Sequence, residues 1–191
     1  MESYKSSGAL NQDGTIPDNA VSFTSTNPEA QTLSRTGTSQ VSKGSAVNPV
    51  DLVLDFPVDI WKVYINDVLA AWAYSPGVSA SGADDFVTFY TAEGSRGVDI
   101  VAESSTKATI TFNTNAMPSG NSEIAAAFIP DATKPDQEIG KSTLATVNVS
   151  DSQSSADAVV GVGPGSGGCS AGLGAVMSIF AAAFLISRKH S

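Results

Sequence analysis

The chain has 191 residues, of which 19 are acidic and 10 are basic, and its formal net charge is −9. It carries no cluster of basic residues that would bind a phosphate backbone, which excludes a nucleic-acid partner. Its single histidine and its single cysteine are His190 and Cys169, both near the C-terminal end. This excludes a Ser–His or Cys–His catalytic system and a zinc site of the usual His/Cys kind. We therefore expect no enzyme activity, no cofactor and no metal centre.

Residues 1–47 are polar and rich in Ser, Thr, Gln and Asn. The stretch 21–38 could form one or two edge strands, with a turn at Asn27-Pro28. We expect this part to be a polar linker or the remnant of a preceding domain. The first residues hold no apolar run of the length of a secretory signal. We therefore expect a fragment of a longer protein or a misassigned start, unless the C-terminal tail alone directs insertion.

The pattern of residues 48–150 predicts a single β domain. From 50 to 56, apolar Val, Leu, Leu and Phe alternate with intervening residues at a period of two, and Pro57 ends the run. Later apolar runs are separated by turn residues in the same way. They predict strands at 85–90, 98–101, 107–112, 123–129 and 143–149.

Two of the apolar runs are close enough to form a hairpin. The stretches 61–65 and 68–74 are separated only by Asn66-Asp67, a pair suited to a two-residue turn. A short helix through residues 67–74 is the alternative, since Ala and Leu favour helices.

Strands at intervals of about 10–14 residues favour an antiparallel β-sandwich. The stretches ATITFNTNAMPSGNSEIAAAF, from residue 108, and STLATVNVS, from residue 142, resemble the closing strands of bacterial Ig-like or fibronectin-like surface modules. The resemblance implies a mainly β chain with an Ig-like sandwich over 48–150.

The aromatic residues of this domain allow two interpretations. Trp61 and Trp72 are most simply core residues. With Tyr64 and Tyr74 they could instead form a platform on which a sugar ring stacks.

The carboxylates give weaker signals. Asp51, Asp55 and Asp59 would share one face of a continuous strand, but an acid/base pair on so small a sandwich is rare. Asp84 and Asp85 are oxygen donors suited to calcium in a loop. Neither pattern is sufficient to predict a metal or a catalytic site.

The remaining residues consist of a spacer and a hydrophobic tail. Residues 151–168 are rich in Ser, Gly and Asp, which is typical of a flexible linker. The uncharged segment 170–187 would rise about 27 Å as a helix, close to the roughly 30 Å of a bilayer core. Arg188 and Lys189 follow it and place the C-terminus in the cytoplasm by the positive-inside rule. We therefore predict a single transmembrane helix within residues 169–191.

The start of this tail resembles a known sorting signal. Its residues are Ser166, Gly167, Gly168, Cys169, Ser170, Ala171 and Gly172, followed by the hydrophobic segment and the basic end. This arrangement is similar to the C-terminal sorting domains of the Synergist-CTERM type. The resemblance implies recognition by a membrane-embedded processing enzyme and surface attachment, with lipid on Cys169 as one form of it. A lone cysteine that cannot form an internal disulfide agrees with this role.

Together these features predict a cell-envelope protein, anchored in the membrane, with its β domain outside the cytoplasm. The domain would have a structural, adhesive or binding role. Its partners would be the membrane, the processing enzyme, and a surface polysaccharide or protein. Two alternatives remain: the stalk and anchor of a larger exported enzyme, and a carbohydrate-binding module.

Overall fold

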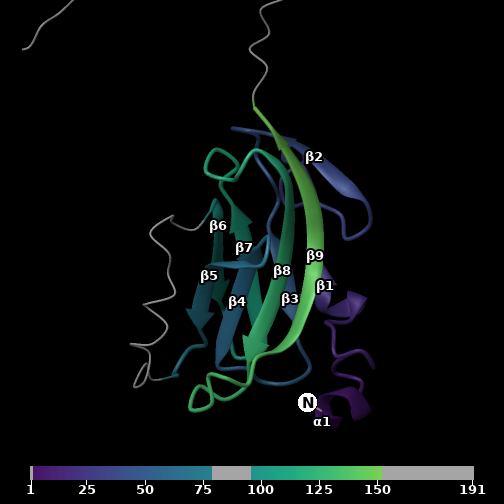
Figure 1. Cartoon of the computed structure of the whole chain (residues 1–191), viewed down its shortest axis with the longest axis vertical. Coiled ribbons are helices and arrows are strands. Elements are labelled where there is room, and N and C mark those ends of the chain that lie inside the picture. Colours follow the sequence, from purple (N-terminus) through teal and green to yellow (C-terminus); the bar gives the residue numbers. More distant parts are fainter. Residues whose placement is uncertain (1, 79–95, 152–191) are drawn as a thin grey trace, which may run out of the picture. The chain divides into compact units, whose positions relative to one another are not determined.

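The computed structural model of the chain describes residues 2–78 and 96–151. Strands make up most of the regular structure, and two short helices precede them (Figure 1). In chain order the elements are α1 (Glu2–Ser6), the 3-10 helix η1 (Asp18–Ala20), β1 (Val21–Ser22), β2 (Thr38–Ser42), β3 (Val50–Val53), β4 (Ile60–Ile65), β5 (Val68–Tyr74), β6 (Val98–Ala102), β7 (Lys107–Phe112), β8 (Gly120–Ile129) and β9 (Ile139–Ser150).

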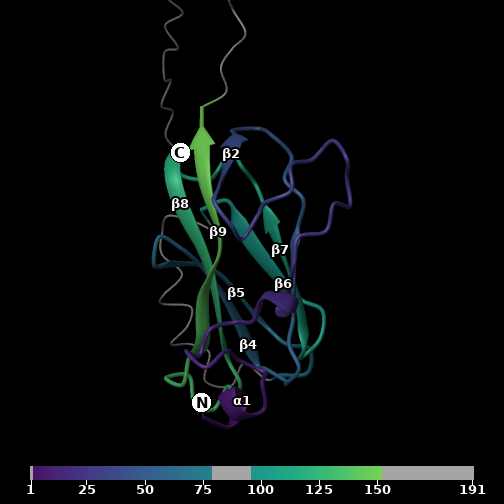
Figure 2. The same cartoon turned by 90° about the vertical axis from the view of Figure 1, so that its right-hand side faces the viewer.

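The strands form two sheets, which confirms a mainly β chain. One sheet has the order β1-β3-β7-β6, and the other has the order β2-β9-β8-β4-β5. Among the described strands, all pairs are antiparallel except β2 with β9, which are parallel over five residue pairs. Figure 2 shows the two layers from the side. The core lies between them.

The predicted strand at 50–56 pairs over a shorter length than expected. Val50 and Leu52 are 2% and 1% exposed, as the period-two pattern requires, but β3 ends at Val53. The chain then crosses from one sheet to the other. Leu54 and Val58 donate their backbone N–H groups to Thr106 O and Ser105 O, in the connection before β7. Asp59 then donates to Ile129 O on β8. The apolar alternation continues because the crossing segment still packs on the core.

The predicted hairpin is confirmed, and the helical alternative is wrong. β4 and β5 pair antiparallel on either side of Asn66 and Asp67. These two residues have φ values of 50° and 64°. Two consecutive positive φ angles are characteristic of a type I′ turn, whose twist matches that of the strands it joins.

The N-terminal part differs from the expected linker. Residues 2–47 supply β1 and β2 and pack into the same core as the later strands. Leu10, Ile16 and Leu33 are all below 5% exposed. Each is an isolated apolar residue in a polar context, so no periodic pattern marks it. A polar stretch can still join a core when single side chains fill gaps along a sheet edge.

The centre of the core is aromatic. Phe128 contacts Trp61 at 6.2 Å between ring centroids and Phe56 at 5.6 Å, both edge to face. Gly140 lies against the Phe128 ring with a φ of +72°, and a Cβ there would come within 2.3 Å of the ring. Only glycine meets both demands at this position.

No helix in the two described ranges is long and apolar enough to cross a membrane. The predicted transmembrane segment 169–191, the motif Ser166–Gly172 and the basic pair Arg188-Lys189 all lie outside those ranges. The predicted strand 85–90 and the acidic pair Asp84-Asp85 also lie outside those ranges.

Candidate functional site

The outer face of β4 and β5 carries the polar and aromatic groups that the sequence singled out. Strand alternation turns Lys62 and Tyr64 on β4, and Trp72 and Tyr74 on β5, away from the aromatic core. Trp72 and Tyr74 contact each other edge to face at 4.9 Å between centroids. They pack on a small second apolar cluster around Ile60 and Ile129.

The structure places the two tryptophans on opposite faces of the sheet. In the β4–β5 register, Trp61 is opposite Ala73, whereas Trp72 is opposite Lys62. Trp61 is 0% exposed, and its indole N–H donates to Ser75 Oγ at 2.9 Å. Its ring is therefore inaccessible to a ligand. The two tryptophans do not form one stacking platform.

A partly buried ion pair lies next to the outer aromatic residues. Lys62 Nζ lies 2.8 Å from Glu138 Oε2, and the Tyr64 hydroxyl donates to the same oxygen at 2.5 Å. Only 11% of the Lys62 side chain and 26% of the Glu138 side chain are exposed. Glu138 belongs to the connection between β8 and β9, so this cluster fastens that connection to β4. Burial, and then the neighbouring Glu138 carboxylate, raise the pKa of Tyr64 far above its usual value.

This pKa shift predicts how stability depends on alkaline pH. The native state holds the Tyr64 proton more tightly than the unfolded chain, whose tyrosine pKa is about 10. The stabilisation is therefore complete below about pH 10 and is lost as the pH rises above it. Urea midpoints measured from about pH 9 to 11.5 should fall more steeply for the wild type than for Tyr64→Phe. Parallel curves for the two proteins would show that Tyr64 does not control this loss.

The Tyr64 ring is also covered from one side. Lys141 Nζ lies 4.4 Å from the ring centroid and 2.9 Å from Asp67 Oδ1. A cation over the ring occupies the surface that a sugar would use for stacking. The cluster therefore holds strands and a loop together, and each of its two carboxylates, Glu138 and Asp67, is paired with a lysine.

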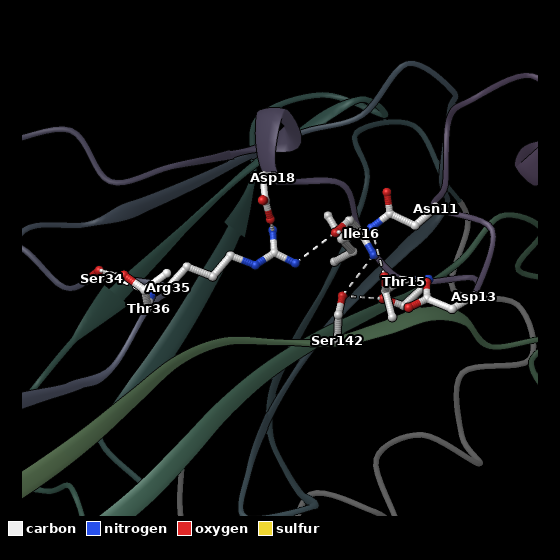
Figure 3. Close-up of polar contacts among 10 residues, drawn as sticks. Asn11, Asp13, Thr15, Ile16, Asp18, Ser34, Arg35, Thr36 and Ser142 are labelled. Atoms are coloured by element: carbon white, nitrogen blue, oxygen red, sulfur yellow. Dashed lines mark hydrogen bonds and ion pairs between the residues drawn. The ribbon is translucent and has the colours of Figure 1, made fainter.

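A second polar cluster holds the N-terminal segment in place (Figure 3). The Arg35 guanidinium donates to Ile16 O at 2.8 Å and lies 3.0 Å from Asp18 Oδ1. Ile16 N–H in turn donates to Ser142 Oγ on β9, at 3.0 Å. A shallow groove of about 360 Å³ lies beside Arg35. Because the guanidinium already has two partners, we assign it a structural role.

Sequence reasoning missed this second cluster because it treated residues 1–47 as a polar linker or the remnant of a preceding domain. The turn chemistry of the segment was the available signal. Asp13 accepts hydrogen bonds from the backbone and hydroxyl of Thr15, which lower its pKa. Such a turn fixes a loop rather than leaving it free.

The remaining predicted carboxylates do not form a common site. Asp51 accepts a hydrogen bond from Thr109 Oγ1 at 2.6 Å, and Asp59 Oδ2 accepts one from the Ala132 backbone at 2.8 Å. Asp55 is exposed in the crossing segment. No three His, Cys, Asp or Glu side chains in residues 2–78 and 96–151 are arranged to hold a metal ion.

Comparison with models of known protein families, with curated proteins and with solved structures gives no match for this chain.

Proposed function

We propose that this chain is a membrane-anchored surface protein whose sandwich is an Ig-like module. The strand order supports the Ig-like assignment. The order β1-β3-β7-β6 corresponds to A-B-E-D of an Ig fold, and β9-β8-β4-β5 corresponds to G-F-C-C′. Trp61 takes the place of the buried tryptophan that Ig domains carry on strand C. Phe128, on the strand equivalent to F, packs edge to face on it.

The sequence after β9 supports the anchor. β9 ends at Ser150 and is followed by the Ser/Gly spacer and the Ser166–Gly172 motif. The motif resembles a sorting signal centred on Cys169, and the basic pair after the hydrophobic segment orients it with the sandwich outside the cytoplasm. The partners in this proposal are the membrane and a processing enzyme embedded in it.

The geometry of β9 carries the proposal. The strand has 12 residues, so it spans about 37 Å. Helix α1 lies near the first residue of β9. Tyr4 contacts Phe56, Phe56 contacts Phe128, and Phe128 is opposite Ile139, where β9 begins. The exit toward the spacer lies at its other end (Figure 1). We propose an adhesive or binding role for a module attached at this end.

A fractionation experiment tests the anchor. Bacterial cells that express the full chain should retain it in the membrane fraction, and protease added to intact cells should digest the sandwich. A double variant, Phe180→Lys/Ala182→Lys, should release the protein, because each lysine near the centre of a membrane helix costs about 2.5–3.5 kcal/mol. The matched control, Ser154→Lys/Ser155→Lys, adds the same charge in the spacer and should stay in the membrane. A wild-type protein in the soluble cytoplasmic fraction would refute the proposal.

A further inference from the structure

We propose that the outer face of β2, β9 and β8 binds a neutral polysaccharide through a row of carboxamide side chains. The row consists of Gln40, Asn148 and Asn121, one from each strand. It deepens the binding role proposed above for the module, on which it rests, but it does not depend on the tail.

The strand register brings these three amides side by side. Gln40 is opposite Asn148 in the parallel β2–β9 pair, and Asn148 is opposite Asn121 in the antiparallel β9–β8 pair. Gln40 and Asn121 are exposed, and Asn148 is half-buried between them. Neighbouring strands are about 4.8 Å apart, so the row presents polar groups at regular short intervals.

A second row of polar side chains runs parallel to the first. It consists of Thr38, Thr146 and Glu123, again opposite one another on the same three strands. Residues two apart on a strand are separated by about 6.7 Å. The two rows together form a grid of hydroxyl, amide and carboxylate groups.

Hydrogen bonds within the grid and from the neighbouring Thr143 orient some of its members. Asn148 Nδ2 donates to Asn121 Oδ1 at 2.6 Å, and Thr143 Oγ1 donates to Glu123 Oε1 at 2.6 Å. The first bond leaves the Asn121 amide nitrogen and the Asn148 amide oxygen for other partners. A donor and an acceptor are thus held next to each other, which suits the adjacent hydroxyls of a sugar ring.

The chemistry of the face selects among classes of partner. Glu123 is the only charged residue among the six of the two rows, and the chain carries a net charge of −9, so a polyanion would be repelled. The two rows contain none of the Trp, Tyr or Arg side chains that anchor most protein interfaces. A neutral polysaccharide fits both conditions, because it needs donors and acceptors without charge.

The proposal is tested by affinity electrophoresis of the full chain, with mild detergent in every sample, in gels that contain one polysaccharide each. The probes are hydroxyethyl cellulose, xyloglucan, dextran and mannan, with alginate as the polyanionic comparison. We expect at least one neutral probe to retard the wild type. The variant Gln40→Ala/Asn121→Ala/Asn148→Ala should bind at least about tenfold more weakly, since three hydrogen-bonding groups are lost.

The matched control is Gln12→Ala/Thr111→Ala/Gln137→Ala, which removes exposed polar groups elsewhere and should bind like the wild type. Urea denaturation of each variant establishes that it is folded. Three results would overturn the proposal: no retardation by any neutral probe, retardation by alginate alone, or equal retardation of the wild type and the carboxamide variant. None of these results would bear on the membrane anchor, which fractionation tests separately.

Discussion

Replacing Trp61 with alanine should lower the free energy of unfolding by about 3–5 kcal/mol. The indole is 0% exposed and packs edge to face on Phe128. Truncation leaves a cavity at the centre of the sandwich that the two sheets cannot close. It also removes the hydrogen bond to Ser75 Oγ, which itself donates to Val58 O at 2.6 Å. The buried Ser75 Oγ would then lose the N–H group from which it accepts a hydrogen bond in the wild type.

Urea denaturation followed by circular dichroism measures this loss. Trp61→Phe should be intermediate, because it keeps an aromatic ring against Phe128 but loses the hydrogen bond. Trp72→Ala is the matched control on the opposite face, where the side chain is only half-buried, and its cost should be clearly smaller. The core assignment would fail if both alanine variants cost the same.

Local patterns explain why much of the sandwich could be predicted. The period-two alternation at 50–56 and the Asn66-Asp67 pair each encode their structure within a few residues. The hairpin needs positive φ at both turn positions, and those residue types tolerate it. The same holds for the strands at 98–101 and 107–112, which lie within β6 and β7.

Long-range contacts explain what could not be predicted. The parallel partners Val41 and Val149 are more than 100 residues apart, and nothing local in β2 indicates β9. The Lys62–Glu138 pair is separated by 76 positions. The opposite faces of Trp61 and Trp72 depend on the register of the hairpin, including a bulge after Val63, and residue spacing alone does not reveal them.

The second large effect concerns the predicted sorting motif. If a processing enzyme recognises the motif around Cys169, replacing that one residue should prevent cleavage of the chain or attachment of lipid to it. Cys169→Ala removes the only thiol and with it the only site for thioether or thioester attachment of lipid. Ser155→Ala, in the spacer before the motif, keeps the thiol and every residue of the motif, and it serves as the control. We expect the control to be processed like the wild type.

Intact-mass spectrometry of the mature protein, from a bacterial host that carries the processing system, tests this account most directly. We predict a wild-type mass that ends near Gly168 or Cys169, or one that carries added lipid, and a Cys169→Ala protein with neither change. An unmodified, full-length wild-type chain would contradict the sorting function.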